Sequence, residues 1–170
     1  MLKHTIFEIK FGWIGIMIND NGVLRTTLPL KSLLEVQNYF GLIYQNSIQD
    51  NNHQKIKIIQ KEITLYFNGE KSQINNIPVD LSNLPDFTNK VLNKCLKIPF
   101  GETRSYKWLG KELGSSKYAR AVGQSLSKNP VPLIIPCHRV ISISGSMQGF
   151  MGGTKRNNLK RRLIDLEKSI

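Results

Sequence analysis

The spacing of apolar residues changes once along this chain of 170 residues, at residues 82–85, and this change limits the fold more than any other feature. Before it, apolar and polar residues alternate, which is the period of a half-buried β-strand. After it, apolar residues recur three and four positions apart, as on one face of a helix. We therefore predict an α/β protein of the α+β type, with an N-terminal α/β domain over 1–81 and a mainly helical C-terminal domain over 82–170.

The first domain has the pattern of a small sheet covered by helices. Asn19 to Gly22 predicts a hairpin turn, because Asn and Gly tolerate positive φ. Residues 46–52 are polar and predict a loop. The other predicted elements are strands over 6–11, 13–18, 23–28 and 72–80 and helices over 30–40 and 53–67.

The second domain begins with a helix that Asp86 is predicted to cap and that extends to Leu96. Two further short helices follow, over 106–113 with Ser105 as its cap and over 117–127. The three-residue turn between them contains glycine, which is typical of a helix-turn-helix and also of many unrelated helical hairpins. A last helix over 155–168 has a predicted apolar stripe of Leu159, Leu163, Leu166 and Ile170.

Positive charge is concentrated in the second part of the chain. The formal net charge of the chain is +12. Most of it comes from residues 101–170, which carry 13 basic and 4 acidic side chains. This surplus favours a polyanionic partner, either nucleic acid or an anionic membrane surface, although a merely soluble basic surface explains it as well.

Two cysteines, Cys95 and Cys137, are too few for a disulfide scaffold or a four-cysteine zinc site, and the three histidines lack paired-ligand spacing. We therefore predict no metal. No run is long enough to span a membrane and no secretory signal is recognised, so we expect a cytoplasmic protein.

Cys137 is the strongest candidate for chemistry. It follows an apolar stretch over 129–136 that three prolines keep from being helical, and a Gly- and Ser-rich loop follows over 142–153. His138 and Arg139 are adjacent, and nearby cations lower a thiol pKa. A buried structural cysteine and a cysteine hydrolase remain as alternatives.

Taken together, residues 85–167 resemble the O6-alkylguanine-DNA alkyltransferase family, the methylated-DNA–protein-cysteine methyltransferases. The segments that carry the resemblance are Pro85-Asp86-Phe87-Thr88, Gly101-Glu102-Thr103-Arg104-Ser105-Tyr106, Ala119-Arg120-Ala121-Val122-Gly123, Asn129-Pro130 and Ile135-Pro136-Cys137-His138-Arg139-Val140. The resemblance implies a ribonuclease-H-like first domain and a second domain with a winged-helix-like helix-turn-helix.

It also implies a repair reaction in which one protein molecule acts once and needs no cofactor. Cys137 would take the alkyl group from O6 of guanine, with O4 of thymine as a second candidate site, and keep it irreversibly. His138 would receive the thiol proton through a water molecule, Asn129 would orient this network, and Tyr106 would protonate the leaving oxygen as a general acid.

A glutamate of the C-terminal helix completes this network in the family. Its usual distance from the cysteine falls here on Ile164. Three extra residues within 154–158 would restore the helical face, and we therefore predict that Glu167 takes this place.

The family rotates the damaged nucleotide out of the duplex, and Arg120 matches the arginine that fills the gap. Its helix would enter the minor groove, where small residues permit close approach. The predicted DNA-binding residues are Arg120, Ala119, Ala121, Gly123, Gln124, Ser125, Lys107, Lys117 and Lys128, with Lys111 and Lys155 as further phosphate contacts. The predicted substrate pocket comprises Tyr106, Leu126, Pro132, Val140, Phe150 and Met151.

The expected partner is double-stranded DNA that contains O6-alkylguanine, bound by a monomer, with no membrane partner. Two rival functions are a binding-only relative, which would lack the cysteine, and a helix-turn-helix regulator with an unrelated first domain. The presence of Cys137 argues against the first rival.

Overall fold

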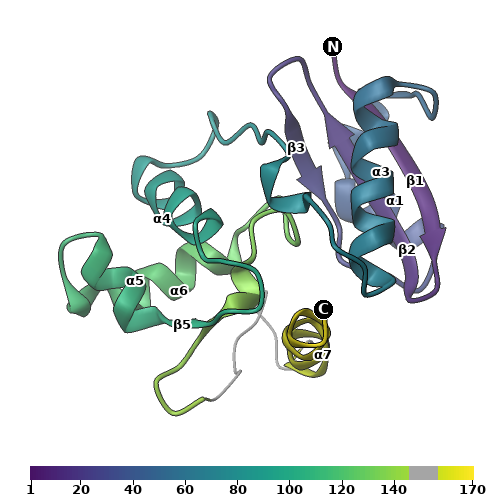
Figure 1. Ribbon diagram of the computed structural model, residues 1–170. Coiled ribbons are helices and arrows are strands. Elements are labelled where there is room, and N and C mark those ends of the chain that lie inside the picture. The colour runs from purple at the N-terminus through teal and green to yellow at the C-terminus, as the bar shows by residue number, and fades with distance from the viewer. Residues whose placement is uncertain (146–156) are drawn as a thin grey trace. The chain divides into compact units, whose positions relative to one another are not determined.

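The computed structural model describes residues 1–145 and 157–170, and its contacts divide the chain into two compact units (Figure 1). The first unit comprises Met1–Leu81 and Pro130–Ile134, and the second comprises Ser82–Asn129 and Ile135–Ile170. Pro130–Ile134 lies in the first unit although its sequence position falls within the predicted second domain. Hydrogen bonds explain this, since Thr26 donates through N to Pro130 O (2.9 Å) and through Oγ1 to Pro132 O (2.8 Å).

A four-stranded sheet of order β3-β2-β1-β4 forms the centre of the first unit. Its strands are β1 (Lys3–Ile9), β2 (Gly12–Ile18), β3 (Val23–Thr26) and β4 (Ile48–Gln49). The first three are antiparallel, whereas β4 pairs in parallel with β1, within the stretch that was predicted to be a loop. The predicted strand over 72–80 is wrong: these residues form a 3-10 turn at Ile74–Asn76 and contribute only a single bridge from Val79 to Val23.

Helices cover both faces of this sheet. The helices are α1 (Leu33–Phe40), α2 (Leu42–Gln45) and α3 (Gln54–Phe67). Met17 and Gly15 of β2 face Val36 and Phe40 of α1, and a side chain at Gly15 would lie only 2.4 Å from Val36 Cγ1. The even-numbered Ile18 points to the other face. Successive side chains of a strand point to opposite faces, and both faces of the sheet are covered at β2, so its side chains are buried on both sides. This explains why its apolar residues are consecutive and do not alternate with polar ones.

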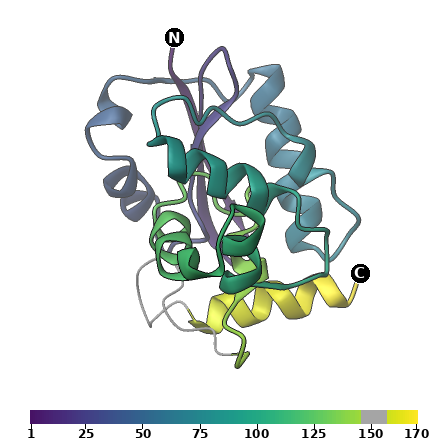
Figure 2. The same ribbon diagram turned by 90° about the vertical axis from the view of Figure 1, so that its left-hand side faces the viewer.

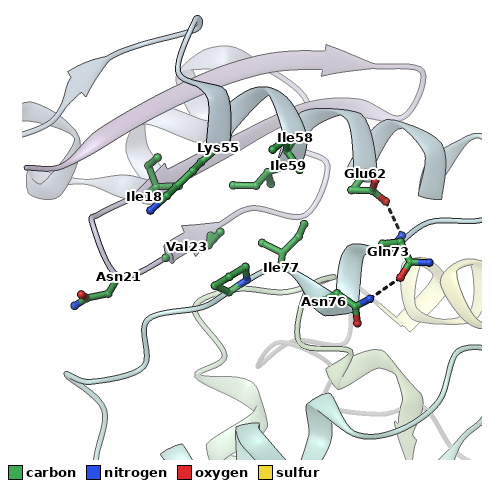
Figure 3. A pocket seen from close by; sticks show the side chains of 12 residues that line it. Ile18, Asn21, Val23, Lys55, Ile58, Ile59, Glu62, Gln73, Asn76 and Ile77 are labelled. Atoms are coloured by element: carbon green, nitrogen blue, oxygen red, sulfur yellow. Dashed lines mark hydrogen bonds between the residues drawn. The ribbon is translucent and has the colours of Figure 1, made fainter.

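A pocket of about 320 Å³ lies within the first unit, between α3 and the chain that follows it (Figure 3). Its walls are mostly apolar, with Ile18 and Val23 from the sheet, Ile59 from α3 and Ile77 from the segment opposite. Glu62 at one end accepts a hydrogen bond from the Gln73 N–H (2.5 Å). All lining residues fall within 18–78, so none of the predicted site residues takes part.

The second unit consists mainly of helices, of which α4, α5 and α6 pack together (Figure 2). The helices are α4 (Asp86–Leu96), α5 (Tyr106–Glu112), α6 (Ala119–Ser127) and α7 (Asn157–Lys168). Two short parallel strands, β5 (Arg104–Ser105) and β6 (Val140–Ile141), join the segment before α5 to the segment after Cys137. The predicted α+β fold is confirmed.

Two predicted caps have different outcomes. Ser105 caps α5, because its Oγ accepts a hydrogen bond from Trp108 N (3.0 Å). Asp86 is not the N-cap of α4: Pro85 occupies that position and Asp86 lies in the first turn, where its charge suits the helix dipole.

The connection between α5 and α6 is longer than the three-residue turn that the sequence predicts. A single 3-10 turn, Ser116–Tyr118, precedes α6, so α6 begins two residues later than predicted. A side chain at Gly110 would lie 2.9 Å from Ser115 O, so only glycine permits this approach of the backbone. Within residues 1–145 and 157–170, no helix has both the length and the apolar character needed to cross a membrane.

Candidate active site

Cys137 begins a buried 3-10 turn, Cys137–Arg139, directly after Pro136. The turn is held by hydrogen bonds from Cys137 N to Ile135 O (2.8 Å) and from Arg139 N to Pro136 O (2.9 Å). The prolines before it prevent helix formation and fix the approach of the chain. The sulfur is therefore held in a defined position, with only 3% of the residue exposed.

Asn129 supports the sulfur from the end of α6. Its Nδ2 donates to Ile135 O (3.0 Å), and its amide also hydrogen-bonds to the Cys137 sulfur. The side chain is buried, with 1% exposed, so both bonds form away from bulk water. Asn129 thus joins the end of a helix to the turn that carries the thiol.

Burial raises the pKa of Cys137 above its ordinary value, so the thiol is protonated at rest. Two neighbours act in the opposite direction: the hydrogen bond from Asn129 and the positive charge of Lys160 both favour the thiolate. Formation of the anion therefore depends on these groups. The other cysteine, Cys95 of α4, is fully buried and its pKa is raised further, first by desolvation and then by the proximity of Cys137.

His138 and Glu167 form a buried pair. His138 Nε2 lies 2.6 Å from Glu167 Oε1, and both side chains are about 1% exposed. Burial lowers the pKa of His138, against the influence of Glu167, so the ring is neutral near pH 7 and can accept a proton. Burial alone would raise the pKa of Glu167, but hydrogen bonds and charge from His138 and Arg139 lower it to about 2.

The loop between α4 and β5 also binds this carboxylate. Gly101 N donates to Glu167 Oε2 (3.1 Å), and Gly101 has φ +75°, in the left-handed region that favours glycine. A side chain there would lie 3.3 Å from Glu167 O. Gly101 is therefore suited to the position by both its conformation and its lack of a side chain.

Lys160 of α7 is a buried cation beside the thiol. Its Nζ donates to Val140 O (2.5 Å) and to Tyr106 Oη (3.4 Å), and none of the residue is exposed. Burial lowers its pKa to about 8, although the negative charge that Cys137 and Cys95 can carry opposes this. Burial also raises the pKa of Tyr106, which keeps the phenol protonated and able to donate.

Lys160 was not among the predicted site residues, because the predicted apolar stripe of the last helix is only partly right: Leu163 is buried, Leu159 and Leu166 are half-buried and Ile170 is exposed. The buried positions of α7 are Lys160, Leu163, Ile164 and Glu167, whereas Ile170 is 46% exposed. These positions follow i, i+3, i+4 and i+7, so the helix does present one face. A search for that spacing with charged residues allowed would have paired Lys160 with Glu167.

The predicted DNA-binding residues fall into two groups. Arg120, Gln124, Lys107, Lys111, Lys117 and Lys128 are exposed, and Ala119, Ala121 and Gly123 are partly exposed. Ser125 is instead buried at 5% exposure against α4, with its Oγ 3.3 Å from Thr88 Oγ1. Ser125 therefore contributes to helix packing and is not available to a ligand.

The predicted pocket residues are similarly divided. The Tyr106 ring packs against Gly123, where an added Cβ would lie 3.8 Å from the ring. Leu126 and Val140 are buried in the same unit. Pro132 belongs to the first unit. Phe150, Met151 and Lys155 lie outside the described residues.

No group of three or more His, Cys, Asp or Glu side chains that could hold a metal ion occurs among the described residues. The groups around the sulfur instead accept protons, donate protons or stabilise an anion. A thiol that is protonated at rest and ionises with the help of such neighbours is suited to nucleophilic attack on a substrate that enters the site. The helix-turn-helix in the same unit suggests that the substrate is a nucleic acid. Fold and site together define a nucleic-acid-directed protein with a cysteine nucleophile.

Comparison with known proteins agrees with this class. Residues 86–169 match the family model described as 6-O-methylguanine DNA methyltransferase, DNA binding domain. A methylated-DNA–protein-cysteine methyltransferase of Methanocaldococcus vulcanius is 36% identical over 163 residues, 95% of each chain. One of Mycobacterium bovis is 43% identical over 108 residues, 64% of this chain and 62% of that one. The crystal structure of Mycobacterium tuberculosis OGT in complex with DNA superposes with a TM-score of 0.80 at 29% identity, over 98% of this chain and 93% of that one.

The chain therefore belongs to the 6-O-methylguanine DNA methyltransferase family. The predicted family resemblance is confirmed.

Proposed function

We propose that the protein repairs alkylated DNA by transferring a methyl or other alkyl group from O6 of guanine to the sulfur of Cys137. Membership of the family supports this reaction, and the relatives are named for it. The single observation that carries the assignment to Cys137 is the set of groups around its sulfur. Asn129 and Lys160 favour the anion there, and the neutral His138 can accept a proton.

The reaction balances without an additional reactant. Sγ attacks the alkyl carbon, the carbon–O6 bond breaks, and its electron pair remains on the guanine. The thiol proton passes to His138 through a water molecule, and Glu167 stabilises the imidazolium that forms. Tyr106 donates a proton to the leaving guanine, and Lys160, which contacts the phenol oxygen, replaces that proton.

The thioether is stable, so each molecule would react once. The leaving oxygen needs a proton because an unprotonated purine oxygen is a poor leaving group. Since the pKa of Tyr106 is raised, its phenol stays protonated at neutral pH and can serve as this donor. The same reaction is proposed for O4-methylthymine, and it is tested with a duplex that carries this base in place of O6-methylguanine.

A base inside a duplex cannot reach a buried sulfur, so the nucleotide must rotate out of the helix. The exposed Arg120 on α6 is suited to fill the gap, while Lys107, Lys117 and Lys128 contact phosphates. Ala119, Ala121 and Gly123 allow α6 to approach the groove. We further propose that the protein binds DNA as a monomer in the cytoplasm.

The proposal is tested by incubating the protein with a duplex that carries O6-methylguanine and weighing the intact protein. We expect a gain of one methyl group, about 14 Da, on the peptide that contains Cys137. Cys137→Ser should gain nothing, and Cys95→Ser is the matched control that should react like wild type. Binding without a mass gain would instead support a binding-only protein or a regulator, and a methyl group on another residue would contradict the assignment to Cys137.

A further inference from the structure

Arg139 is an almost completely buried cation of the second unit. Its Nε donates to Glu167 Oε2 (2.8 Å) and its Nη2 to Glu167 Oε1 (3.0 Å). Its Nη1 donates to Ile98 O (2.7 Å), and the guanidinium lies 5.2 Å from the centre of the Phe100 ring. Only 1% of the residue is exposed.

The two bonds to Glu167 fix the plane of the carboxylate. A guanidinium fork that binds both oxygens of a carboxylate leaves that carboxylate little freedom to rotate. Glu167 Oε1 is shared between Arg139 and His138, so the arginine also determines where the oxygen that meets the imidazole lies. A lysine, which is a single point charge, would hold the group less firmly.

The fork has a consequence for proton transfer. An ionised Glu167 accepts the Nε2 hydrogen of His138, so that the other ring nitrogen is free of its proton and can accept one. If Glu167 became protonated, it would donate to Nε2 instead, and the second ring nitrogen would then carry the hydrogen and lose its ability to accept. His138 can therefore act as a base only while Glu167 is ionised.

We propose that Arg139 is a positioning residue, which holds Glu167 ionised and turned toward His138 so that His138 can accept the proton of Cys137. This inference rests on the proposed function and adds to it a group that does not touch the substrate. Without Arg139, the carboxylate would remain buried and would lose two of its hydrogen bonds, one to each oxygen. Burial would then raise its pKa, because desolvation acts in that direction.

The titratable and charged groups that act on the pair come from several elements. Arg139 of the Cys137 turn acts on both members, and Lys160 of α7 acts on His138. The other titratable groups of the site are Cys137, Cys95 of α4 and Tyr106 of α5, which act on one another, and the two cysteines also act on Lys160. Arg139 and Lys160 both lower the pKa of His138. Loss of Arg139 would therefore raise the pKa of His138 as well as that of Glu167, and both changes make His138 a poorer proton acceptor in mild acid.

The test is the pH dependence of alkyl transfer from an O6-methylguanine duplex, followed by intact mass for wild type, Arg139→Met and Arg139→Lys. We expect Arg139→Met to move the acid side of the profile up by about one pH unit or more, so that the rate loss is largest near pH 6 and smaller near pH 9. Arg139→Lys should recover part of the shift, because it keeps the charge. Arg161→Met, which removes an exposed arginine from the same helix as Glu167, is the matched control and should keep the wild-type profile.

A second measurement separates positioning from a loss of folding. In the background of Glu167→Gln, Arg139→Met should cause a smaller further shift of the profile than it causes in wild type, because only the direct effect of the arginine charge on His138 remains once the carboxylate is gone. An equal loss of rate at every pH, or a full additional shift in the Glu167→Gln background, would overturn the proposal.

The same profile is measured with iodoacetamide, and alkylation of the Cys137 peptide is followed by mass. This probe reads the ionisation of the thiol without DNA. If wild type fails to accept an alkyl group from DNA, the proposed function fails. If the iodoacetamide profile of Arg139→Met matches that of wild type, only the positioning role fails.

Discussion

The two units of this protein bury polar side chains of different kinds. In the first unit most of them are uncharged hydroxyl groups, such as Thr5, which donates to Asn51 Oδ1, and Thr27, whose Oγ1 accepts from Gly15 N. In the second unit the buried polar side chains include two basic residues and one acidic residue, Arg139, Lys160 and Glu167, together with the titratable His138. A buried hydroxyl needs only a hydrogen bond, whereas a buried charge costs several kcal/mol unless a partner compensates it.

This difference indicates where the molecule performs chemistry. Perturbed pKa values cluster at functional sites, because a group that must gain or lose a proton there cannot have its ordinary affinity for it. Lys160 and Glu167, whose pKa values are lowered to about 8 and about 2, both lie in the second unit on one face of α7. The first unit is a packed support by comparison, and the following predictions test that contrast.

The largest expected effect is on stability when the charge cluster is broken. Glu167→Ala leaves Arg139 buried without its partner and should lower the free energy of unfolding by about 3–5 kcal/mol. Lys3→Met, which removes one side of the partly exposed ion pair between Lys3 Nζ and Asp50 Oδ2 (2.9 Å) in the first unit, should cost far less, because water screens this pair. Urea denaturation of both variants gives the comparison. Similar losses would mean that the buried charges contribute no more than surface ones.

The next effect concerns packing: an added methyl group should destabilise the first unit more than the second. A Cβ at Gly15 would lie 2.4 Å from Val36 Cγ1 and 2.6 Å from Phe40 Cε2, both of which are buried, so Gly15→Ala should cost about 1–3 kcal/mol. A Cβ at Gly123 on α6 would meet the Tyr106 ring at 3.8 Å, an ordinary contact. Gly123→Ala should therefore be neutral, or stabilising by up to about 1 kcal/mol through helix propensity. Thermal unfolding measures both, and a destabilised Gly123→Ala would reverse the comparison.

The smallest effect on stability is expected for Lys160, and its sign depends on pH. The pKa of Lys160 is lowered to about 8 from an ordinary 10.5, so the folded state binds the proton less tightly than the unfolded state. Stability from this group is therefore present above pH 10.5 and is lost as the pH falls through about 8. Lys160→Met removes that penalty and should leave stability at pH 7 unchanged or about 1 kcal/mol higher, while it slows the reaction of Cys137 with iodoacetamide.

The matching control for Lys160→Met is Lys168→Met, which removes an exposed lysine from the same helix. It should change neither the stability nor the alkylation rate. A large loss of stability in Lys160→Met would show that the bond from Lys160 to Val140 O outweighs the cost of burying the charge.

Much of the fold follows from local sequence. The hairpin at Asn19 to Gly22, the cap at Ser105 and the short helices that precede and form the helix-turn-helix were predicted, because turns, caps and helical spacing are set by neighbouring residues. The errors concern longer contacts. β4 consists of two residues that gain strand geometry only by pairing with β1, and the segment 130–134 takes its place through bonds to Thr26, more than 100 residues away.

For the site, the sequence by itself determined the nucleophile and the groups near it along the chain. Cys137, with its prolines and its two basic neighbours, lies in one short segment, and the family motif extends this to Tyr106 and Asn129. Only the tertiary structure decided which face of α7 meets that segment, and so brought Glu167 to His138 across 29 residues and buried Lys160 beside Tyr106. The physical reason is that an amphipathic helix can hide charged residues as part of its inner face when partners compensate them, and those partners lie on other elements, where local spacing gives no sign of them.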